Sequence, residues 1–391
     1  MSTRTVSIVG SGHTQFGRLD ATLEDLIVAA AQEALDEAGL DASEVDAVYL
    51  GHFNSGLVPD GFASSLIHQV SPKLRFKPAT RCENACASGS AALFSAMNAI
   101  SAGEAEVVLV VGAEKMTSRN TQEVTQALAG AGYQNDPYEA SLSFPQLFGL
   151  AAQQYSERYH CPLETMAHIA AKNHQNALRN PLAQMQRNLD FNACNTVSER
   201  NPLIAPSLRL TDCSLITDGA AAVVLVSPER AKSFQREVVI KGKSHISDIL
   251  PISSRDLLTM EGAEKAITYA MKNAGVGLQD LSFAEVHDCF TIAELLIYEA
   301  MGITPRGQGH RAISEGAVLR EGSLPVNLSG GLKAKGHPVG ATGVSMHAIS
   351  YRQLTNQAGD MQLDRPELSL TFNMGGTAVA NYATVLEAKR V

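Results

Sequence analysis

The sequence lacks an excess of basic charge, which many nucleic-acid-binding proteins have. Its 31 lysines and arginines are outnumbered by 40 aspartates and glutamates, and the net charge is −9. Acidic and basic residues are interspersed, so no general footprint for nucleic acid exists, although a local basic patch for a phosphorylated ligand is not excluded. We therefore expect no nucleic-acid partner.

Long hydrophobic runs are also missing. Hydrophobic residues make up 45% of the chain, yet no run approaches the ~20 apolar residues of a membrane span. The N-terminal stretch MSTRTVSIVGSG has no basic segment followed by an apolar one, as a secretory signal would. These absences predict a cytoplasmic protein that does not enter a membrane.

Cysteine motifs are sparse. The six cysteines stand at positions 82, 86, 161, 194, 213 and 289. Cys82 and Cys86 are spaced Cys-x3-Cys, but a structural zinc site needs a second such pair, and cytosolic chains seldom form disulfides. We expect no metal site, which leaves an inert thiol or a nucleophile as the interpretations of Cys86.

Strand-like and helix-like segments alternate along the 391 residues. Residues 5–12 and 105–116 have the apolar character of buried strands, and residues 22–40 predict a helix with Thr22 as its N-cap and Gly39 as its stop. The alternation indicates an α/β fold with a parallel-rich sheet.

An internal duplication divides the chain. Residues 30–52 resemble residues 266–288 in their order of helix, Ala-Gly stop, linker and strand, and residues 86–101 resemble residues 337–350. Two similar halves would bring equivalent turns face to face, and the turns of this duplication begin at Cys86 and His337.

The segment between about residues 117 and 213 interrupts the pattern. Its residues 126–149 have the composition of a loop, and amphipathic helices follow. We predict an N-terminal half made of residues 1–116 and 214–235, an inserted cap or loop domain of residues 117–213, and a C-terminal half of residues 236–391.

Cys86 precedes a helix rich in small residues, SGSAALFSAMNAISAG. Amide groups and the dipole at a helix N-terminus favour a thiolate, so this placement suits a nucleophile, while tight helix packing explains the small residues equally well. The string AKGHPVGATG adds His337 on a glycine-rich turn, which suits an imidazole that activates a cysteine. In EVHDCF, His287 is placed to donate an N–H to an oxyanion, and Asp288 is interpreted as a capping or orienting carboxylate.

Four motifs in this order, NACASGSAAL, VHDCFTIAEL, NLSGGLKAKGHPVGATG and FNMGGTAVA, resemble the thiolases within the Claisen-condensing enzymes. The resemblance spans nearly the whole chain. It implies a layered αβαβα fold of two duplicated halves and reversible condensation or thiolysis of 3-ketoacyl-CoA, with acyl-CoA and acetyl-CoA as substrates and no bound cofactor. It also implies a homodimer or homotetramer.

The resemblance assigns roles to matching positions. Cys86, activated by His337, would carry the acyl group; amides of Cys86 and of the Met374–Gly375 region would form an oxyanion hole. His287 and His337 would hold the enolate oxygen. The resemblance further suggests CoA contacts for Ser214 and for Phe148 in the cap.

Two departures separate this chain from common bacterial thiolases. Those enzymes carry Asn-Glu-Ala-Phe where this chain has HDCF, and a catalytic cysteine before a glycine run where it reads TFNMGG. Both changes resemble the sterol-carrier-protein type of thiolase, in which the HDCF cysteine replaces the missing one. Cys289 is therefore the expected proton shuttle.

Two other functions remain open from the sequence. Cys86, His287 and His337 also form the Cys-His-His set of decarboxylating ketoacyl synthases. A non-catalytic or channelling partner in a multi-enzyme acyl-CoA assembly is the second alternative.

Overall fold

A computed structural model describes residues 5–389 of the protein. Its strands are β1 (Val6–His13), β2 (Ala47–Gly51), β3 (Ala79–Cys82), β4 (Val107–Glu114), β5 (Leu203–Ala205), β6 (Leu208–Arg209), β7 (Gly219–Val226), β8 (Val238–Ser247), β9 (Phe283–Val286), β10 (Leu368–Gly375) and β11 (Ala380–Ala388). Its helices are α1 (Leu23–Ala38), α2 (Ser88–Ala102), α3 (Thr121–Ala129), α4 (Pro137–Ala140), α5 (Phe144–Arg158), α6 (Leu163–Ala177), α7 (Phe191–Asn195), α8 (Pro228–Ala231), α9 (Glu261–Ala274), α10 (Thr291–Ala300), α11 (His310–Ser314) and α12 (Thr342–Leu354). None of the helices in the described part of the chain is long and apolar enough to cross a membrane.

The two halves repeat one another element by element. Thr22 caps α1 through a capping box with Asp25, and Gly39 ends the helix in the left-handed conformation, as the sequence predicts. A short 3₁₀ turn then leads into β2. In the second half, α9 ends at Gly275 in the same left-handed conformation and a 3₁₀ turn leads into β9. The predicted duplication is therefore present in the structure.

One sheet runs through both halves in the order β3-β2-β4-β7-β1-β8-β11-β10-β9. Strands β1 and β8 join the halves by an antiparallel pairing. Three of the eight neighbouring pairs are parallel, namely β2 with β3, β2 with β4 and β9 with β10. The prediction of a parallel-rich sheet is thus wrong. The last strand of each half is antiparallel to its neighbours. A short connection brings β11 beside β10, and β7 pairs with β4 after the inserted segment.

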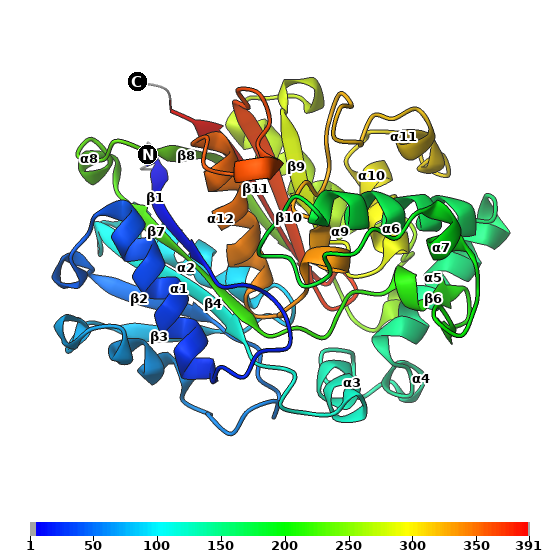
Figure 1. Ribbon diagram of the computed structural model, residues 1–391, viewed down its shortest axis with the longest axis horizontal. Helices are drawn as coiled ribbons and strands as arrows, with labels where there is room; N and C mark the ends of the chain where they lie inside the picture. The colour runs from blue at the N-terminus through cyan, green and yellow to red at the C-terminus, as the bar shows by residue number, and fades with distance from the viewer. Residues whose placement is uncertain (1–4, 390–391) are drawn as a thin grey trace.

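Helices cover the sheet in layers. Alternate residues of β4 face opposite sides: Leu109 and Val111 pack in the core with α1, whereas Val108 and Val110 pack with α2. The core around α2 also includes residues of α12 and of both halves of the sheet, and Figure 1 shows α12 standing between the halves. Helices α9 and α10 pack in a further core on the C-terminal half. The order is α1, the N-terminal part of the sheet, α2 with α12, the C-terminal part of the sheet, and α9 with α10, which is the expected αβαβα arrangement.

The segment between β4 and β7 holds α3 to α7 and the hairpin of β5 and β6. The prediction of loop structure for residues 126–149 is wrong in part, because the end of α3, the short helix α4 and the start of α5 lie there. Ser143 forms a capping box with Gln146, and a proline stands in the first turn of α5. Phe148 and Met166 place α5 and α6 in the same core as α10. The division into three domains stays a prediction.

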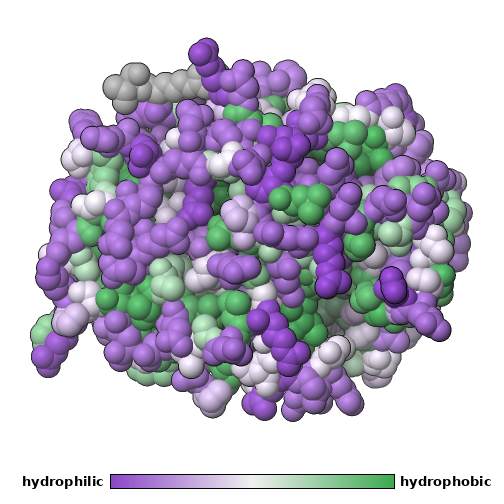
Figure 2. All heavy atoms as spheres, in the orientation of Figure 1, coloured by the Kyte–Doolittle hydropathy of each residue, from purple (hydrophilic) through white to green (hydrophobic). Residues whose placement is uncertain are grey.

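Hydrophilic residues cover most of the face shown in Figure 2, and hydrophobic residues appear on it in separate small groups. This pattern agrees with a chain whose apolar side chains fill the layers described above.

Candidate active site

Cys86 lies in a tight turn between β3 and α2. The amide of Ala87 donates to the carbonyl of Asn84 at 3.0 Å, and the amide of Ser88 donates to the carbonyl of Ala85 at 3.1 Å. Ala85 adopts a positive φ of 51°, an uncommon conformation for a residue with a Cβ. The turn leaves Cys86 partly exposed, directly before the buried start of α2.

His337 lies in a second turn, between a π-helix at Gly331–Lys335 and α12. Gly336 has a φ of +120°, and a Cβ there would lie 2.8 Å from a methyl carbon of Thr217, so only glycine fits. The amide of His337 donates to Thr217 Oγ1 at 3.0 Å. These constraints fix the backbone from which the imidazole projects.

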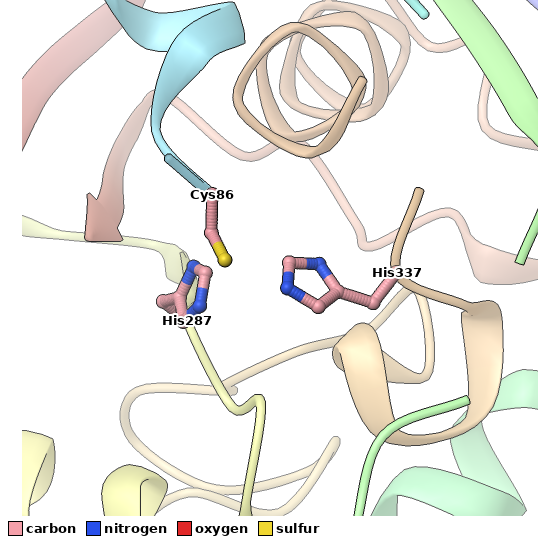
Figure 3. A group of neighbouring side chains, drawn as sticks. All are labelled: Cys86, His287 and His337. Carbon is pink, nitrogen blue, oxygen red and sulfur yellow. The ribbon is translucent and has the colours of Figure 1, made fainter. Parts of the chain in front are cut away.

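The close approach of the two turns brings their side chains together. A Cβ on Gly89 would lie 2.8 Å from the carbonyl oxygen of Gly340, so the absence of a side chain at Gly89 lets α2 meet the turn before α12. The sulfur of Cys86 and one ring nitrogen each of His287 and His337 all lie within 4.8 Å of one another, and the three side chains converge in Figure 3. The two imidazole rings are 5.1 Å apart and nearly perpendicular, at 88°.

The tautomer of His337 follows from its hydrogen bonds. Thr342 Oγ1 donates to the carbonyl of Pro338 at 3.1 Å and lies 2.7 Å from Nδ1 of His337. Because the single hydroxyl proton is used on Pro338, the oxygen accepts from Nδ1–H. Nε2 of the neutral ring therefore carries a lone pair, as a base toward Cys86 requires.

Burial keeps the reactive groups uncharged at neutral pH. It raises the pKa of the Cys86 thiol to about 12, and the charge of Glu114 acts in the same direction, whereas hydrogen bonds from the amides of Gly376 and Cys86 lower that pKa. It also lowers the pKa of His337 to about 3, with a further contribution from Lys335. The pKa of His287 lies well below its usual value because of burial and of His337.

The position of Cys86 before α2 does not by itself stabilise a thiolate. Helix α2 starts at Ser88, and the amides of Ala87 and Ser88 are already bonded to carbonyls of the turn. Desolvation of the thiolate outweighs the amides that do reach the sulfur. The resting pair is a neutral thiol beside a neutral imidazole.

Cys289 lies deeper than Cys86 and is 7% exposed. Burial raises the pKa of its thiol well above the usual value, and the charges of Cys86 and Asp288 act in the same direction. The neighbouring Asp288 accepts hydrogen bonds from the amides of Leu332 and Lys333 at 2.6 and 3.1 Å. Through these contacts Asp288 holds the π-helix that precedes His337, in agreement with the orienting role that the sequence indicated.

The three remaining predicted residues differ in their access to the site. Ser214 is partly exposed, and its amide donates to the carbonyl of Cys289 at 2.9 Å. Phe148 is fully buried and stacks on Phe290 with ring centres 4.6 Å apart, so it has no free surface for a direct contact with CoA and instead supports the HDCF loop. The predicted oxyanion-hole residue Gly375 adjoins the turn of Cys86, while the amide that bonds the sulfur belongs to the next residue, Gly376.

Sequence reasoning missed two residues that contact the imidazoles. Thr342 bonds His337, and Asn373 lies 2.8 Å from Nδ1 of His287. Both stand inside motifs that already pointed to the site, GHPVGATG and TFNMGG. Their polar character at fully buried positions is the signal that marks them, but burial is known only from the fold.

The Cys-His-His group also has the donor types that zinc prefers. Binding a metal there would need Cys86 as a thiolate and would occupy Nε2 of His337. The expectation of no metal site stays a prediction.

Comparisons with known proteins agree with this geometry. Residues 6–229 match the family model described as "Thiolase, N-terminal domain", and residues 244–388 match "Thiolase C-terminal domain-like". The chain is 36% identical over 380 residues to an acetyl-CoA acetyltransferase of Methanothermobacter thermautotrophicus, with 96% of this chain and 97% of the relative covered. It is 31% identical over 396 residues to sterol carrier protein 2 of Homo sapiens, with coverages of 95% and 70%.

Two solved structures share the fold. The Ltp2-ChsH2(DUF35) aldolase superimposes with a TM-score of 0.82 at 22% identity, covering 99% of this chain and 98% of the other. Human mitochondrial 3-ketoacyl-CoA thiolase in complex with CoA gives a TM-score of 0.74 at 19% identity, with 99% of each chain covered.

Proposed function

Because the chain belongs to the thiolase family of CoA-dependent acyltransferases, we propose that Cys86, His337, His287 and Cys289 together catalyse reversible condensation and thiolysis of 3-ketoacyl-CoA. The observation that carries this assignment is the convergence of the Cys86 thiol with two neutral imidazoles from the second half of the fold. Such a group supplies a nucleophile, a base and a hydrogen-bond donor.

In the first half-reaction, Nε2 of His337 takes the thiol proton of Cys86 as its sulfur attacks the carbonyl carbon of an acyl-CoA. Amides of Cys86 and of the 374–376 loop donate to the oxyanion of the tetrahedral intermediate. The carbon–sulfur bond to CoA then breaks, and the CoA thiolate takes a proton from Cys289. Cys289 is a protonated thiol at rest and so has a proton to give, and its raised pKa makes the resulting thiolate a strong base for the next half-reaction.

In the second half-reaction, the Cys289 thiolate removes an α-proton from acetyl-CoA. The imidazolium of His337 and the N–H of His287 donate to the enolate oxygen. The carbanion attacks the acyl group, and the carbon–sulfur bond to Cys86 breaks. The Cys86 thiolate recovers its proton from His337, and thiolysis is the reverse sequence.

Trapping the acyl-enzyme tests the assignment. Mixing the protein with acetyl-CoA and quenching in acid should add one acetyl group, which peptide mass spectrometry places on Cys86. The Cys86→Ala variant is the control and should take up none. A wild-type protein that stays unmodified, with no thiolysis of acetoacetyl-CoA, would refute the proposed function.

Cys289→Ala tests the proton shuttle separately. We expect acetyl-transfer to Cys86 to persist while condensation and thiolysis fall by about 10²- to 10⁴-fold, the usual contribution of a positioned acid or base. Cys213→Ala is the matched control, since Cys213 is a buried thiol in the adjacent strand-like segment that pairs with Phe290. Full activity of Cys289→Ala would remove Cys289 from the mechanism.

The alternative of a decarboxylating ketoacyl synthase is distinguished by its substrate. Such an enzyme obtains its carbanion from loss of CO2 and needs no proton-abstracting thiol, so the second buried thiol at Cys289, two residues after His287, favours the thiolase. Turnover of a malonyl thioester without turnover of acetyl-CoA would reverse the choice. Acylation of Cys86 likewise distinguishes an enzyme from a non-catalytic assembly partner.

Compartment, assembly and metabolic role complete the proposal. Free thiols at all six cysteines fit a reducing compartment such as the cytoplasm. A homodimer or homotetramer, a role in fatty acid and lipid metabolism, and the absence of a bound cofactor follow from the family resemblance. The name of the Ltp2-ChsH2(DUF35) aldolase joins two components, which supports testing whether this protein also binds a partner protein.

A further inference from the structure

Asn373 contacts both Cys86, from the first half of the fold, and His287, from the second half. It is 1% exposed, near the end of β10. Its side-chain nitrogen Nδ2 lies 2.8 Å from Nδ1 of His287 and donates to the carbonyl oxygen of Cys86 at 3.3 Å. Its oxygen Oδ1 accepts from the hydroxyl of Ser90 at 2.8 Å.

The orientation of this amide is determined by its partners. A backbone carbonyl oxygen can only accept, so the atom of Asn373 that faces Cys86 must be the nitrogen. The hydroxyl of Ser90 satisfies the amide oxygen on the other side. One N–H of Asn373 therefore serves the Cys86 carbonyl, and the second points to Nδ1 of His287.

A ring nitrogen that accepts a hydrogen bond carries no proton. His287 is buried, 1% exposed, and the burial that disfavours its cationic form leaves it neutral. Its single proton is then on Nε2, the nitrogen left to face Cys86 and His337. His337 has the opposite arrangement, because the hydroxyl of Thr342 accepts from its Nδ1.

We propose that Asn373 is a positioning residue that holds His287 in the Nε2–H tautomer, so that one imidazole of the site is a fixed hydrogen-bond donor while the other is a fixed base. The inference rests on the proposed function for its catalytic consequence, but the tautomer itself is a property of the free protein. The two differences from common bacterial thiolases are thereby linked, because His287 of HDCF and Asn373 of TFNMGG are hydrogen-bond partners.

The tautomer is measured directly on the wild-type protein. In protein labelled with ¹⁵N-histidine, the signal removed by His287→Gln identifies this ring. We expect its Nδ1 to have the chemical shift of an unprotonated nitrogen and its Nε2 that of a protonated one, unchanged between about pH 6 and pH 8.5. A protonated Nδ1 on His287 in the wild type would overturn the proposal.

Asn373→Asp tests the consequence for catalysis. A carboxylate can only accept, so it moves the proton of neutral His287 to Nδ1 and turns the lone pair of Nε2 toward the oxyanion. We expect kcat for thiolysis to fall by about 10²- to 10³-fold at high pH, as for loss of one oxyanion donor, with KM little changed. The carboxylate also raises the pKa of His287, so activity should recover as the pH falls and the imidazolium regains its Nε2–H.

Two controls keep the outcome interpretable. Asn373→Ala removes the partner without reversing the hydrogen bond, and should reduce kcat without the acid-side recovery. Asn201→Ala removes another buried amide that donates to backbone carbonyls, far along the chain, and should leave the His287 signals in place. An Asn373→Asp enzyme with wild-type kcat and a flat pH profile would refute the inference, whereas absence of acetyl-Cys86 in the wild type would refute only the proposed function.

Discussion

At Cys86, burial and the neighbouring amides act on the thiol in opposite directions, and burial has the larger effect. The pKa of about 12 means that attack must be accompanied by proton transfer to His337. That base is available over a wide pH range, because its own pKa is about 3. Reactivity is thus a property of the pair and not of the cysteine alone.

Alkylation of Cys86 by iodoacetamide, followed by peptide mass spectrometry, tests this account. We expect the wild-type rate to change less than about threefold between about pH 6 and pH 9, since the neutral pair is the dominant state throughout. In His337→Ala only the thiolate reacts, so the rate should rise about tenfold per pH unit. A wild-type rate that titrates near neutral pH would instead indicate a preformed thiolate–imidazolium pair.

Among the elements, the contact between α2 and the turn before α12 determines whether the two catalytic groups meet. Gly89 in the first turn of α2 faces the carbonyl oxygen of Gly340 and the amide of Val344, both rigid backbone atoms. A side chain at this contact separates the start of α2 from the turn that holds His337. The spacing of Cys86 and His337 is therefore set by glycine positions outside the chemistry.

Gly89→Ala should for this reason affect stability and catalysis together. The added Cβ would lie 2.8 Å from the Gly340 oxygen, and such overpacking costs about 1–3 kcal/mol of unfolding free energy. We also expect slower acetylation of Cys86, because the distance to His337 increases. Gly61→Ala is the control, since no atom lies within 4 Å of the added Cβ and its φ is not positive, and urea unfolding with acetyl trapping measures both variants. Wild-type stability of Gly89→Ala would contradict the role of this contact.

Across the whole molecule, burial of histidines makes stability depend on pH. Burial lowers the pKa of five buried imidazoles, and the pKa reaches about 4 in one of them and about 3 in two others: His13, His174, His287, His337 and His347. Between these values and the ordinary pKa near 6.5, the unfolded chain binds more protons than the folded one. Buried Asp288, whose pKa is raised to about 7, acts in the opposite direction over part of this range.

The unfolding free energy should accordingly fall as the pH drops from about 6.5 to about 5, with up to about 1.4 kcal/mol per pH unit from each buried histidine. His174 is the best single probe, because it is 1% exposed and neither of its ring nitrogens has a hydrogen-bond partner among the described residues. His174→Leu should flatten the pH dependence measured by urea unfolding, and the exposed His168→Leu is the control. Equal pH slopes for His174→Leu and the wild type would show that His174 does not contribute.

Local signals in the sequence were sufficient to predict many of the helices and strands and the turns that carry much of the site. The cap and stop of α1, the duplicated order of helix and strand, and the turns carrying Cys86 and His337 all follow from neighbouring residues. These features depend on backbone preferences and hydrophobic periodicity, which act over a few residues.

Only the tertiary structure decided the features that depend on distant partners. The antiparallel course of β7 and β11, the raised pKa of Cys86 and the buried position of Phe148 result from packing between segments far apart in the chain. The bond from Asn373 to His287 joins residues 86 positions apart and sets a proton position that no local pattern encodes. The sequence alone determined which chemical groups are present and which turns carry them; folding determined their protonation, because burial and hydrogen-bond partners exist only once the halves have packed.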